Sequence, residues 1–433
     1  MSRILVISRG VVGREMGSPG VRAYHMARVL AEELPDARVT LSVPNTADIE
    51  SPHPRMKIVS AGSTLNGLRQ MMQHDIIISR NFRPYTAALF LNKRIALDFF
   101  TTFWIEWMEL SKRMGRRSQR SLWMDSNRHY LNFQLTLADY LICSNERQRD
   151  HWVGALSALG LITTGVYDRD SNLRSMIDVA PYGVQRGLPT HERQVLKGVI
   201  PGINPDDKVV IWNGLIVEWF DADTVIRAMA RISQTRNDVK LFFLGTNHPD
   251  QLTSVDAPPV QRAIHLSKQL GIYERSVFFN VGWVPDSEIG NYLAESDIGV
   301  CAAFDNIEAR YSFRTRFMDL FWAELPTVCT RGDVLAARIA GDPLGVAVAP
   351  GDDQALANAI LRLIEDQDFY GQCKSNMAAV KADMSWQRVL EPLVEFCRTG
   401  KSGAMPKRQR VFPLLRRSIA YFIERSLVPI VRW

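Results

Sequence analysis

The chain has 433 residues, a formal net charge of +6, 46% hydrophobic residues and 23% charged residues. These values are typical of folded globular proteins and exclude intrinsic disorder for most of the chain. The five cysteines are widely separated and form no CxxC pair. Their spacing excludes a disulfide scaffold, argues against a structural zinc site and favours a reducing compartment.

The beginning of the chain predicts a buried strand rather than a secretory leader, because its first apolar run is only four residues long, at 4–7. No stretch of about 20 uncharged apolar residues is present, so no segment is expected to span a bilayer. The length predicts two or three domains.

In the first half of the chain, short apolar runs alternate with helical patterns such as the one at 21–33. The predicted strands are 4–8, 38–43, 57–60, 75–79, 94–98, 140–144 and 176–179. This βαβα order predicts a parallel sheet covered by helices on both faces.

The same pattern repeats in the second half. Strands are predicted at 208–212, 240–245, 277–280, 298–302, 327–330 and 345–348, with helices at 222–233, 261–270, 288–296, 314–323 and 353–366. A segment rich in glycine and proline, 185–205, is expected to link the halves. The predicted fold class is therefore α/β, with doubly wound domains at 1–190 and 191–400 that face each other across a cleft, followed by a tail at 401–433. Ligands of such sheets bind at the carboxyl ends of the strands.

The loop after the first predicted strand contains Gly17, Ser18 and Gly20 just before a helix. Glycines allow backbone amides to approach an anion or a sugar closely, and a helix N-terminus adds positive potential. The loop is neither a Walker motif nor a GxGxxG motif, so it can equally be only a turn.

The segment 305–319 follows the predicted strand 298–302 and gathers three arginines, Arg310, Arg314 and Arg316, where a helix begins. Guanidinium groups bind phosphate oxygens in a fork, and a carboxylate one turn later, Asp319, could hold ribose hydroxyls. The alternative is an exposed helix start with salt bridges. The apolar residues that follow indicate a buried helix and favour a functional role for its polar end.

Segment 312–328 resembles the donor-binding segment of GT4-type glycosyltransferases, and further similarities occur at 282–285, 212–221, 181–183 and 143–148. The resemblance extends over roughly residues 1–400. It implies the GT-B architecture, retention of configuration at the anomeric carbon, and a nucleotide-sugar donor held by the C-terminal domain. It also implies that no essential metal or other cofactor is needed.

By position, Arg316 matches the basic residue that meets the donor diphosphate, and Asp319 matches the acid that holds the ribose. Trp283 and Val284 lie where the base is usually held. The expected donor-binding set is Gly17, Ser18, Gly20, Gly214, Trp283, Val284, Ser312, Phe313 and Asp319. The expected catalytic set is Arg316, Arg314, Glu308 and Asp98.

This sequence departs from the family pattern in two places. Tyr311 stands where many members have a glutamate that touches the donor sugar, so either Glu308 takes that role or the sugar is held differently. The usual Arg and Lys after the strand that ends before Gly214 are missing, and we expect Arg310 and Arg314 to replace their charge. Asp98 is a candidate to face the sugar, with capping of the next turn as the alternative.

Other classes fit less well. A Rossmann dehydrogenase would need an acid at the end of its second strand, where 43–45 reads Val-Pro-Asn. The Asp221-Ala222-Asp223 sequence resembles a metal motif of a different fold but is explained by helix capping. His25 is expected to be packed rather than catalytic. A non-catalytic nucleotide-sugar or glycan binder with the GT-B fold is the remaining alternative.

The positive charge is concentrated in the tail. Residues 401–433 hold eight basic groups and one acid, a net charge of +7, so the first 400 residues sum to −1 and a nucleic-acid surface is not predicted. The tail predicts an amphipathic helix on an anionic membrane surface, or alternatively a helix packed onto the body. Basic and aromatic residues at 99–120 can equally serve lipid headgroups or form a core helix with a charged face. We therefore expect a cytoplasmic protein, peripheral on the inner face of the membrane, with a glycan or lipid-linked acceptor, in bacterial surface polysaccharide assembly (O-antigen, capsule or exopolysaccharide).

Overall fold

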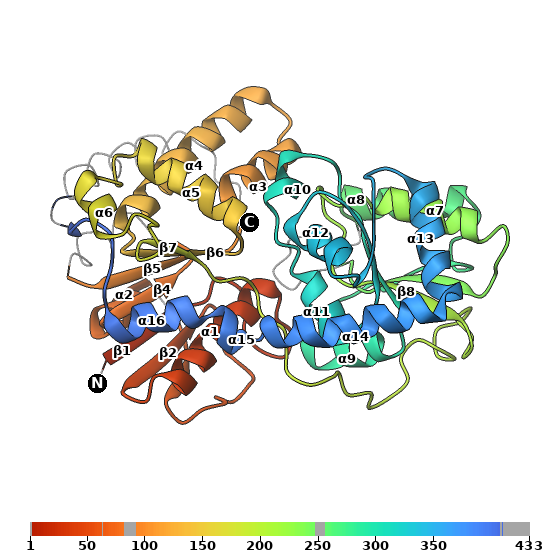
Figure 1. The fold of residues 1–433 in the computed structure, drawn as a ribbon, viewed down its shortest axis with the longest axis horizontal. Helices are drawn as coiled ribbons and strands as arrows, with labels where there is room; N and C mark the ends of the chain where they lie inside the picture. Colours follow the sequence, from red (N-terminus) through yellow and green to blue (C-terminus); the bar gives the residue numbers. More distant parts are fainter. Residues whose placement is uncertain (1, 63, 82–91, 247–255, 408, 410–433) are drawn as a thin grey trace. The chain divides into compact units, whose positions relative to one another are not determined.

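The computed structural model describes residues 2–62, 64–81, 92–246, 256–407 and 409. The chain forms two compact units, which are described separately (Figure 1). Unit 1 consists of Met1–Tyr182 and Trp386–Trp433, and unit 2 of Gly183–Ser385. Both units are α/β structures with parallel sheets, as the alternating strand and helix patterns predicted.

Unit 1 contains a seven-stranded sheet with the order β3-β2-β1-β4-β5-β6-β7, and all its pairings are parallel. The strands are β1 (Ser2–Ile7), β2 (Ala37–Val43), β3 (Met56–Ser60), β4 (Ile76–Ser79), β5 (Arg94–Phe99), β6 (Tyr140–Cys143) and β7 (Ile177–Val179). Central strands such as β4 are buried along their whole length, because helices cover both faces of the sheet.

The helices of unit 1 are α1 (Ser18–Glu33), α2 (Thr64–Gln73), α3 (Phe103–Leu110), the 3-10 helix η2 (Ser111–Arg113), α4 (Arg117–Leu137), α5 (Glu146–Ala158), α6 (Thr164–Arg169), α15 (Trp386–Val389) and α16 (Glu391–Thr399). Helix α1 packs with α15 and α16 on one face of the sheet, and α4 and α5 cover the other (Figure 1). Trp386 stacks on His25 with ring centroids 4.6 Å apart, and Phe396 stacks on Tyr140 at 4.7 Å. These contacts attach the C-terminal helices to unit 1.

Unit 2 contains a six-stranded parallel sheet with the order β10-β9-β8-β11-β12-β13. Its strands are β8 (Lys208–Trp212), β9 (Val239–Phe243), β10 (Val277–Phe279), β11 (Ile298–Cys301), β12 (Thr327–Thr330) and β13 (Gly345–Val348). The helices are α7 (Ala222–Ile232), α8 (Pro258–Gln269), α9 (Asp286–Ala294), α10 (Ile307–Tyr311), α11 (Arg316–Trp322), α12 (Val334–Gly341), α13 (Asp353–Glu365) and α14 (Gln367–Asp383).

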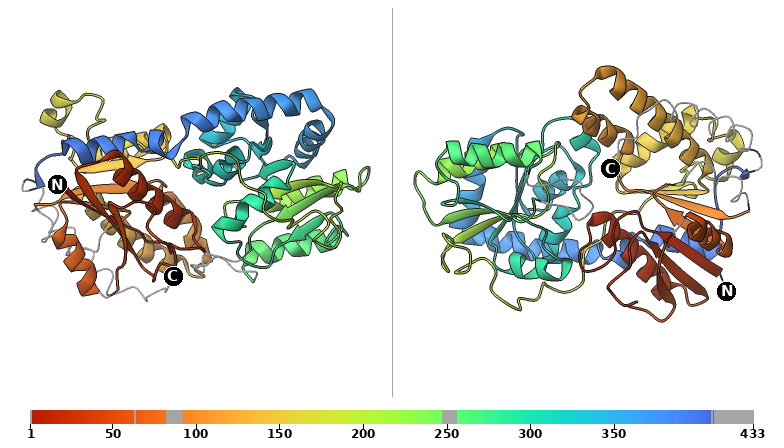
Figure 2. Two further views of the ribbon diagram at one scale, coloured as in Figure 1. Left: turned by 90° about the horizontal axis from the view of Figure 1, so that it is seen from below. Right: turned by 180° about the vertical axis from the view of Figure 1, so that it is seen from behind.

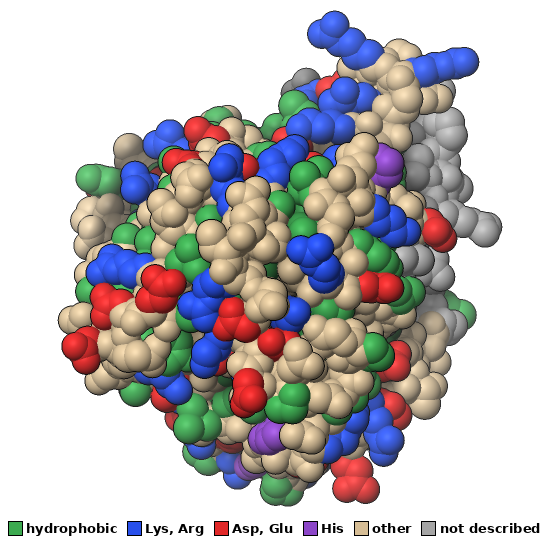
Figure 3. All heavy atoms as spheres, turned by 90° about the vertical axis from the view of Figure 1, so that its right-hand side faces the viewer, with side chains coloured by type: hydrophobic (Ala, Val, Ile, Leu, Met, Phe, Trp, Pro, Cys, Tyr) green, Lys and Arg blue, Asp and Glu red, His purple; other side chains and the backbone are tan. Residues whose placement is uncertain are grey.

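Helices of unit 2 lie on both faces of its sheet. Helix α7 packs against α8 and α13 on one face, and α11 packs against α14 on the other (Figures 1 and 2). The surface around α7 and α13 carries side chains of both signs in close mixture (Figure 3). Arg231 pairs there with Asp353 at 3.0 Å, and Arg236 pairs with Asp238 at 2.6 Å. This face therefore presents no large field of one sign.

The boundary between the units differs from the expected one in two ways. Segment 185–205 belongs to unit 2 and is packed onto it, because the carboxylate of Glu295 accepts hydrogen bonds from the backbone amides of Val195, Leu196 and Lys197 at 2.7–2.9 Å. Segment 386–400, which the sequence placed with the second domain, packs with unit 1 instead. The chain thus leaves unit 1 for unit 2 after Tyr182 and returns to unit 1 after Ser385.

The predicted basic helix of the tail lies outside the described residues, which end at 409. Within the described part, Lys407 forms an ion pair with Asp139, and Gly403 donates to the carbonyl of Ser175 at 2.9 Å. All five cysteines are buried and free. No helix among the described residues is long and apolar enough to cross a bilayer.

Candidate functional site

The candidate site of unit 2 lies where its strand order reverses. Strand β8 leads to β9 on one side of the sheet, whereas β11 lies on the other side of β8 and leads to β12. Loops that leave the carboxyl ends of two such strands diverge and open a crevice. Asn213 and Gly214 directly follow β8, and α10 and α11 follow β11.

Asn213 forms hydrogen bonds between the loop after β8 and helix α11. Its amide nitrogen lies 2.8 Å from the carbonyl oxygen of Arg316 and 3.2 Å from a carboxylate oxygen of Asp319. Gly214 has a φ of +109°, which a residue with a side chain adopts only under strain. A Cβ at this position would also contact the Arg316 guanidinium at about 3.5 Å. Asn213 and Gly214 therefore shape the loop after β8 against which the Arg316 side chain packs.

The guanidinium of Arg316 is folded against aromatic rings. It lies 3.7 Å from the ring centroid of Phe220 and 4.9 Å from that of Trp212, and its Nη2 donates to the carbonyl of Leu215 at 2.9 Å. Its Nη1 is buried and has no hydrogen-bond partner among the described residues. Burial, and secondarily the charge of Arg314, lowers the pKa of Arg316 to about 10. The group remains cationic at neutral pH, and its Nη1 is a donor without a partner among the described residues.

Arg314 is held differently, because two carboxylates neutralise it. Its Nη2 donates to Glu308 at 2.8 Å, and its Nε lies 3.9 Å from Asp333. All three side chains are at least 95% buried. The Ser312 hydroxyl lies 2.6 Å from the other oxygen of Glu308. Arg314 therefore fixes the orientation of Glu308, and the expectation that its charge replaces the missing cations does not fit this arrangement.

Asp319 and Asp286 form the acidic part of the site. Burial, followed by the charge of Asp286, raises the pKa of Asp319 to about 7, while the Asn213 hydrogen bond acts in the opposite direction. Asp286 opens α9 directly after the predicted base-binding residues Trp283 and Val284, of which Val284 is buried. Because the charge of Asp286 acts on Asp319, the start of α9 after the 282–285 loop lies on the same side of the unit as Asp319. Phe313 is half-buried, and Arg310 is exposed at the end of α10.

The remaining predicted residues, Gly17, Ser18, Gly20 and Asp98, lie in unit 1. Gly17 is the N-cap of α1. Gly20 has a packing role, since a Cβ there would lie 2.0 Å from the carbonyl oxygen of Val11. These residues stand at the carboxyl ends of β1 and β5, which is the edge of the sheet where the topology places ligands.

Asp98 is engaged by an arginine that the sequence analysis did not identify. Arg22 of α1 donates from Nε and Nη2 to the two carboxylate oxygens at 2.7 and 2.8 Å, and both residues are at least 98% buried. Arg22 also donates to the carbonyls of Ala180 and Pro181 at 2.8 Å. Both carboxylate oxygens of Asp98 are therefore committed to a buried ion pair with Arg22 rather than to the cap of the next turn. The sequence signal that could have identified Arg22 is its position within the apolar pattern of α1, where a buried arginine needs an acidic partner.

Two expected structural roles are confirmed. Asp221 is the N-cap of α7 and accepts a hydrogen bond from the amide of Thr224 at 3.0 Å. His25 is packed against Trp386, and burial lowers its pKa to about 3. In the described part of the chain, no group of three or more histidine, cysteine or acidic side chains is arranged to hold a metal ion.

Comparison with known proteins relates this geometry to carbohydrate enzymes. Residues 207–366, which contain the whole unit 2 cluster, match the family model of group 1 glycosyl transferases. No curated protein matches the chain. Sucrose-phosphate synthase from Thermosynechococcus elongatus is 15% identical, with 92% of this chain and 98% of that chain covered and a TM-score of 0.59.

Two further solved structures align over a similar extent. HepE from Anabaena, in complex with UDP and glucose, is 14% identical, with 92% and 100% coverage and a TM-score of 0.60. WaaG, a glycosyltransferase involved in lipopolysaccharide biosynthesis, is 14% identical, with the same coverage and a TM-score of 0.59. The two parallel-sheet units thus form the GT-B fold, as the sequence predicted. Its second unit carries a domain that is similar to group 1 glycosyl transferases.

Proposed function

We propose that this protein is a retaining glycosyltransferase of the GT4 type. It transfers a sugar from a nucleotide-diphosphate sugar to a glycan or lipid-linked acceptor and uses no resident metal or other cofactor. The observation that carries this proposal is the cluster of Asn213, Arg316 and Asp319 at the reversal point of the unit 2 sheet, inside the segment that matches group 1 glycosyl transferases.

The cluster has unsatisfied groups that suit such a donor. Nη1 of Arg316 and Oδ1 of Asn213 are both buried without a hydrogen-bond partner among the described residues. A diphosphate oxygen would accept from the first, and a hydroxyl would donate to the second. The carboxylate of Asp319 would accept from ribose hydroxyls. The neighbouring Trp283–Val284 segment would border the base.

The proposed reaction forms a bond between an acceptor hydroxyl oxygen and the anomeric carbon, while the bond from that carbon to the diphosphate oxygen breaks. The departing phosphate takes the hydroxyl proton, so no side chain has to act as the base. Arg316 lowers the barrier because it is fixed in place before negative charge develops on the leaving oxygen. Glu308, held by Arg314, is the acid assigned to the donor sugar.

The proposed setting is bacterial surface polysaccharide assembly, at the cytoplasmic face of the membrane. WaaG, with its role in lipopolysaccharide biosynthesis, supports this setting by analogy of fold. In unit 1, Lys112, Arg116 and Arg117 are exposed at the turn between α3 and α4, and the adjacent side chain of Met108 is 46% exposed. Such a surface and the basic tail would both attract anionic lipid. Cosedimentation with anionic vesicles, with and without residues 401–433, tests the tail's part.

A screen of nucleotide sugars tests the activity. The full-length protein is incubated with UDP-, GDP-, ADP-, CMP- and dTDP-linked sugars, and free nucleotide and sugar are quantified by mass spectrometry. We expect slow hydrolysis of one donor, and faster loss of it when membrane glycolipid extract is added. Absence of turnover with every donor, in the presence of extract, would contradict the proposal.

A non-catalytic nucleotide-sugar binder is the second candidate, because of two features. Tyr311 occupies the position of an expected acid, and Arg314 forms ion pairs with Glu308 and Asp333. Saturable donor binding without hydrolysis or transfer in the same screen would favour this second candidate.

A further inference from the structure

Phe220, which precedes α7, contacts both buried arginines of the unit 2 site. The centroid of its ring lies 3.7 Å from the guanidinium carbon of Arg316 and 4.7 Å from that of Arg314. The residue is only 6% exposed, so its main surroundings are protein groups rather than water. One aromatic ring thus borders two cations, and the two cations are held in place by different means.

The position of the Phe220 ring is fixed from two directions. Phe220 forms an antiparallel bridge with Ala303, and the amide of the next residue, Asp221, donates to the carbonyl of Ala302 at 3.0 Å. These contacts join the loop after β8 to the chain that leaves β11, across the reversal point of the sheet. The ring also stands nearly perpendicular to that of Trp212, with centroids 5.7 Å apart and an interplanar angle of 83°.

Aromatic rings hold Arg316, whereas carboxylates hold Arg314. Within the described ranges, no carboxylate forms an ion pair with Arg316, and its guanidinium donates a single hydrogen bond, to the carbonyl of Leu215 at 2.9 Å. A carboxylate fixes a guanidinium but occupies its donors and cancels its charge, as Glu308 does for Arg314. An aromatic face fixes the plane of the guanidinium and leaves the donors at its edge, and its charge, available.

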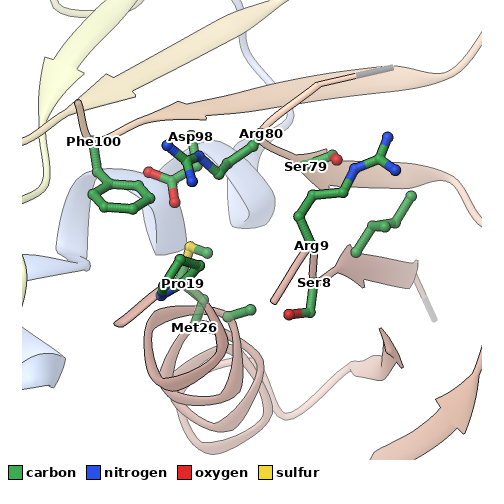
Figure 4. A pocket seen from close by; sticks show the side chains of 10 residues that line it. Ser8, Arg9, Pro19, Met26, Ser79, Arg80, Asp98 and Phe100 are labelled. Atoms are coloured by element: carbon green, nitrogen blue, oxygen red, sulfur yellow. The ribbon is translucent and has the colours of Figure 1, made fainter. Parts of the chain in front are cut away.

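The same arrangement is found in unit 1. The guanidinium of Arg80, the residue after β4, lies 4.4 Å from the ring centroid of Phe100 and 4.6 Å from that of Phe103. Figure 4 shows Arg80, Asp98 and Phe100 in the wall of a hollow that Arg9 also lines. Nε of Arg80 is buried and has no hydrogen-bond partner in the described part of the chain. Each unit therefore places one arginine on aromatic rings at the reversal point of its sheet.

We propose that Phe220 is a positioning residue for the donor diphosphate: its ring holds the guanidinium of Arg316 in the orientation in which Nη1 donates to a phosphate oxygen. This inference rests on the proposed function and adds to it a residue that acts on the ligand through Arg316. Because the ring restricts the side chain before the donor binds, less conformational entropy is lost on binding. Because it carries no charge, the phosphate meets a cation that no carboxylate has neutralised.

Calorimetric titration of the full-length protein with UDP, GDP, ADP and inorganic pyrophosphate tests the proposal without requiring turnover. We expect at least one of these diphosphates to bind wild type, and to bind Phe220→Leu roughly tenfold more weakly, the loss expected for a desolvated cation–π contact. Phe220→Tyr keeps the ring and should restore most of the affinity.

Phe242→Leu is the matched control for the loss of a buried ring. Phe242 lies in β9, is 3% exposed and packs against Tyr292, and no arginine or lysine of the described residues stacks on its ring. The Phe242→Leu variant should be destabilised but should retain the diphosphate affinity of wild type. An equal loss of affinity in Phe242→Leu and Phe220→Leu would overturn the proposal, because any buried ring of the unit would then have the same effect.

A double-mutant cycle shows whether Phe220 acts through Arg316. Phe220→Leu should weaken diphosphate binding in the wild-type background and have no further effect in Arg316→Gln. Equal losses in both backgrounds would assign Phe220 a structural role and overturn the proposal. Wild-type affinity in Phe220→Leu, or a loss in Phe220→Tyr as large as in Phe220→Leu, would also overturn it. Should Phe220→Leu unfold, which the melting temperature reveals, Phe220→Met takes its place with the same criteria.

The outcomes separate this proposal from the proposed function. Diphosphate binding that depends on Phe220, in a protein that transfers no sugar, would support the positioning role and contradict the transferase. Sugar transfer with unchanged diphosphate affinity in Phe220→Leu would contradict the positioning role alone. Failure of every diphosphate to bind wild type would overturn both.

Discussion

The reversal points of the two sheets use arginine in opposite ways. In unit 2, Arg314 is neutralised by Glu308 and Asp333, and Arg316 is stacked on Phe220 with its buried Nη1 lacking a partner among the described residues. In unit 1, the acid is the residue that is neutralised: Arg22 engages both oxygens of Asp98, and Arg80 retains a buried donor without a partner. The same topology thus places a neutralised arginine at one reversal point and a neutralised acid at the other.

This difference shows that counting charged residues in a loop does not give the charge offered to a ligand. Three arginines in 310–316 predict a strongly cationic site, yet Arg314 serves to fix Glu308. Conversely, the sequence indicates Asp98 as a residue that faces the sugar, yet its carboxylate is committed to a buried ion pair with Arg22. Buried pairs organise a site, whereas the cations left after pairing recognise ligands.

The largest expected effect comes from breaking the pair in unit 1. Arg22→Met leaves Asp98 buried without its cation, so we expect the unfolding free energy to fall by about 3–5 kcal/mol. Urea denaturation measures the loss, and hydrogen exchange should localise it to β5. The double variant Arg22→Met/Asp98→Leu removes both charges and should recover most of the stability. A single variant within about 1 kcal/mol of wild type would mean that the pair is not a structural requirement.

The second prediction separates the two arginines of unit 2. Arg316→Gln should weaken nucleoside diphosphate binding by roughly 10- to 100-fold, the equivalent of about 1.5–3 kcal/mol for a hydrogen bond to a charged group. Its stability should change little by comparison. Arg314→Gln should instead destabilise unit 2 by about 3–5 kcal/mol, because Glu308 and Asp333 lose their cation. Calorimetry and urea denaturation measure the two quantities.

Arg310→Gln, which changes an exposed arginine of the same segment, is the control for this comparison. It should leave both donor affinity and stability close to those of wild type. If Arg314→Gln weakens donor binding without loss of stability, Arg314 acts on the ligand directly and the contrast drawn between the two residues is wrong.

The smallest expected effect is a pH dependence in unit 2. The pKa of Asp319 is raised to about 7 in the folded protein, so between pH 4 and 7 the folded state binds more protons than the unfolded state. Stability from this group is therefore greatest at low pH and is lost as pH rises to about 7. Asp319→Asn should remove the dependence, with a relative gain of on the order of 1 kcal/mol above pH 7. Urea denaturation of both proteins from pH 4.5 to 8 measures it, and parallel curves would contradict the raised pKa.

Local patterns predicted most of the fold. The strand at 208–212 coincides with β8, because the apolar run 209–212 follows the charged residues 206–208 and precedes Asn213 and Gly214. The helix expected at 314–323 begins two residues later, at Arg316, since Arg314 precedes the helix in a loop and turns to Glu308 and Asp333. The unit boundary was less predictable, because the attachment of α15 and α16 depends on stacking with His25 and Tyr140, far away in sequence.

The candidate site was also predictable only in part, because local sequence patterns do not encode contacts between distant residues. Position after a strand and the family resemblance indicated Gly214, Arg316 and Asp319, which the structure brings together around Asn213. The pairing of the charged residues could not be predicted from the sequence. Arg22 and Asp98 are 76 positions apart, and no periodicity encodes their contact. Arg80 had a readable signal, because it follows a predicted strand just as Arg9 does.

The two crossings of the chain after Tyr182 and Ser385 also have a consequence for biosynthesis. Unit 2 is continuous and can complete its structure as soon as its own residues have left the ribosome, whereas unit 1 must wait until Trp386 and Phe396 emerge. At roughly 5–20 residues per second, translation of the intervening unit takes some ten to forty seconds. Throughout that interval the nascent N-terminal half exposes the rings of His25 and Tyr140, and it is therefore the half most in need of a chaperone.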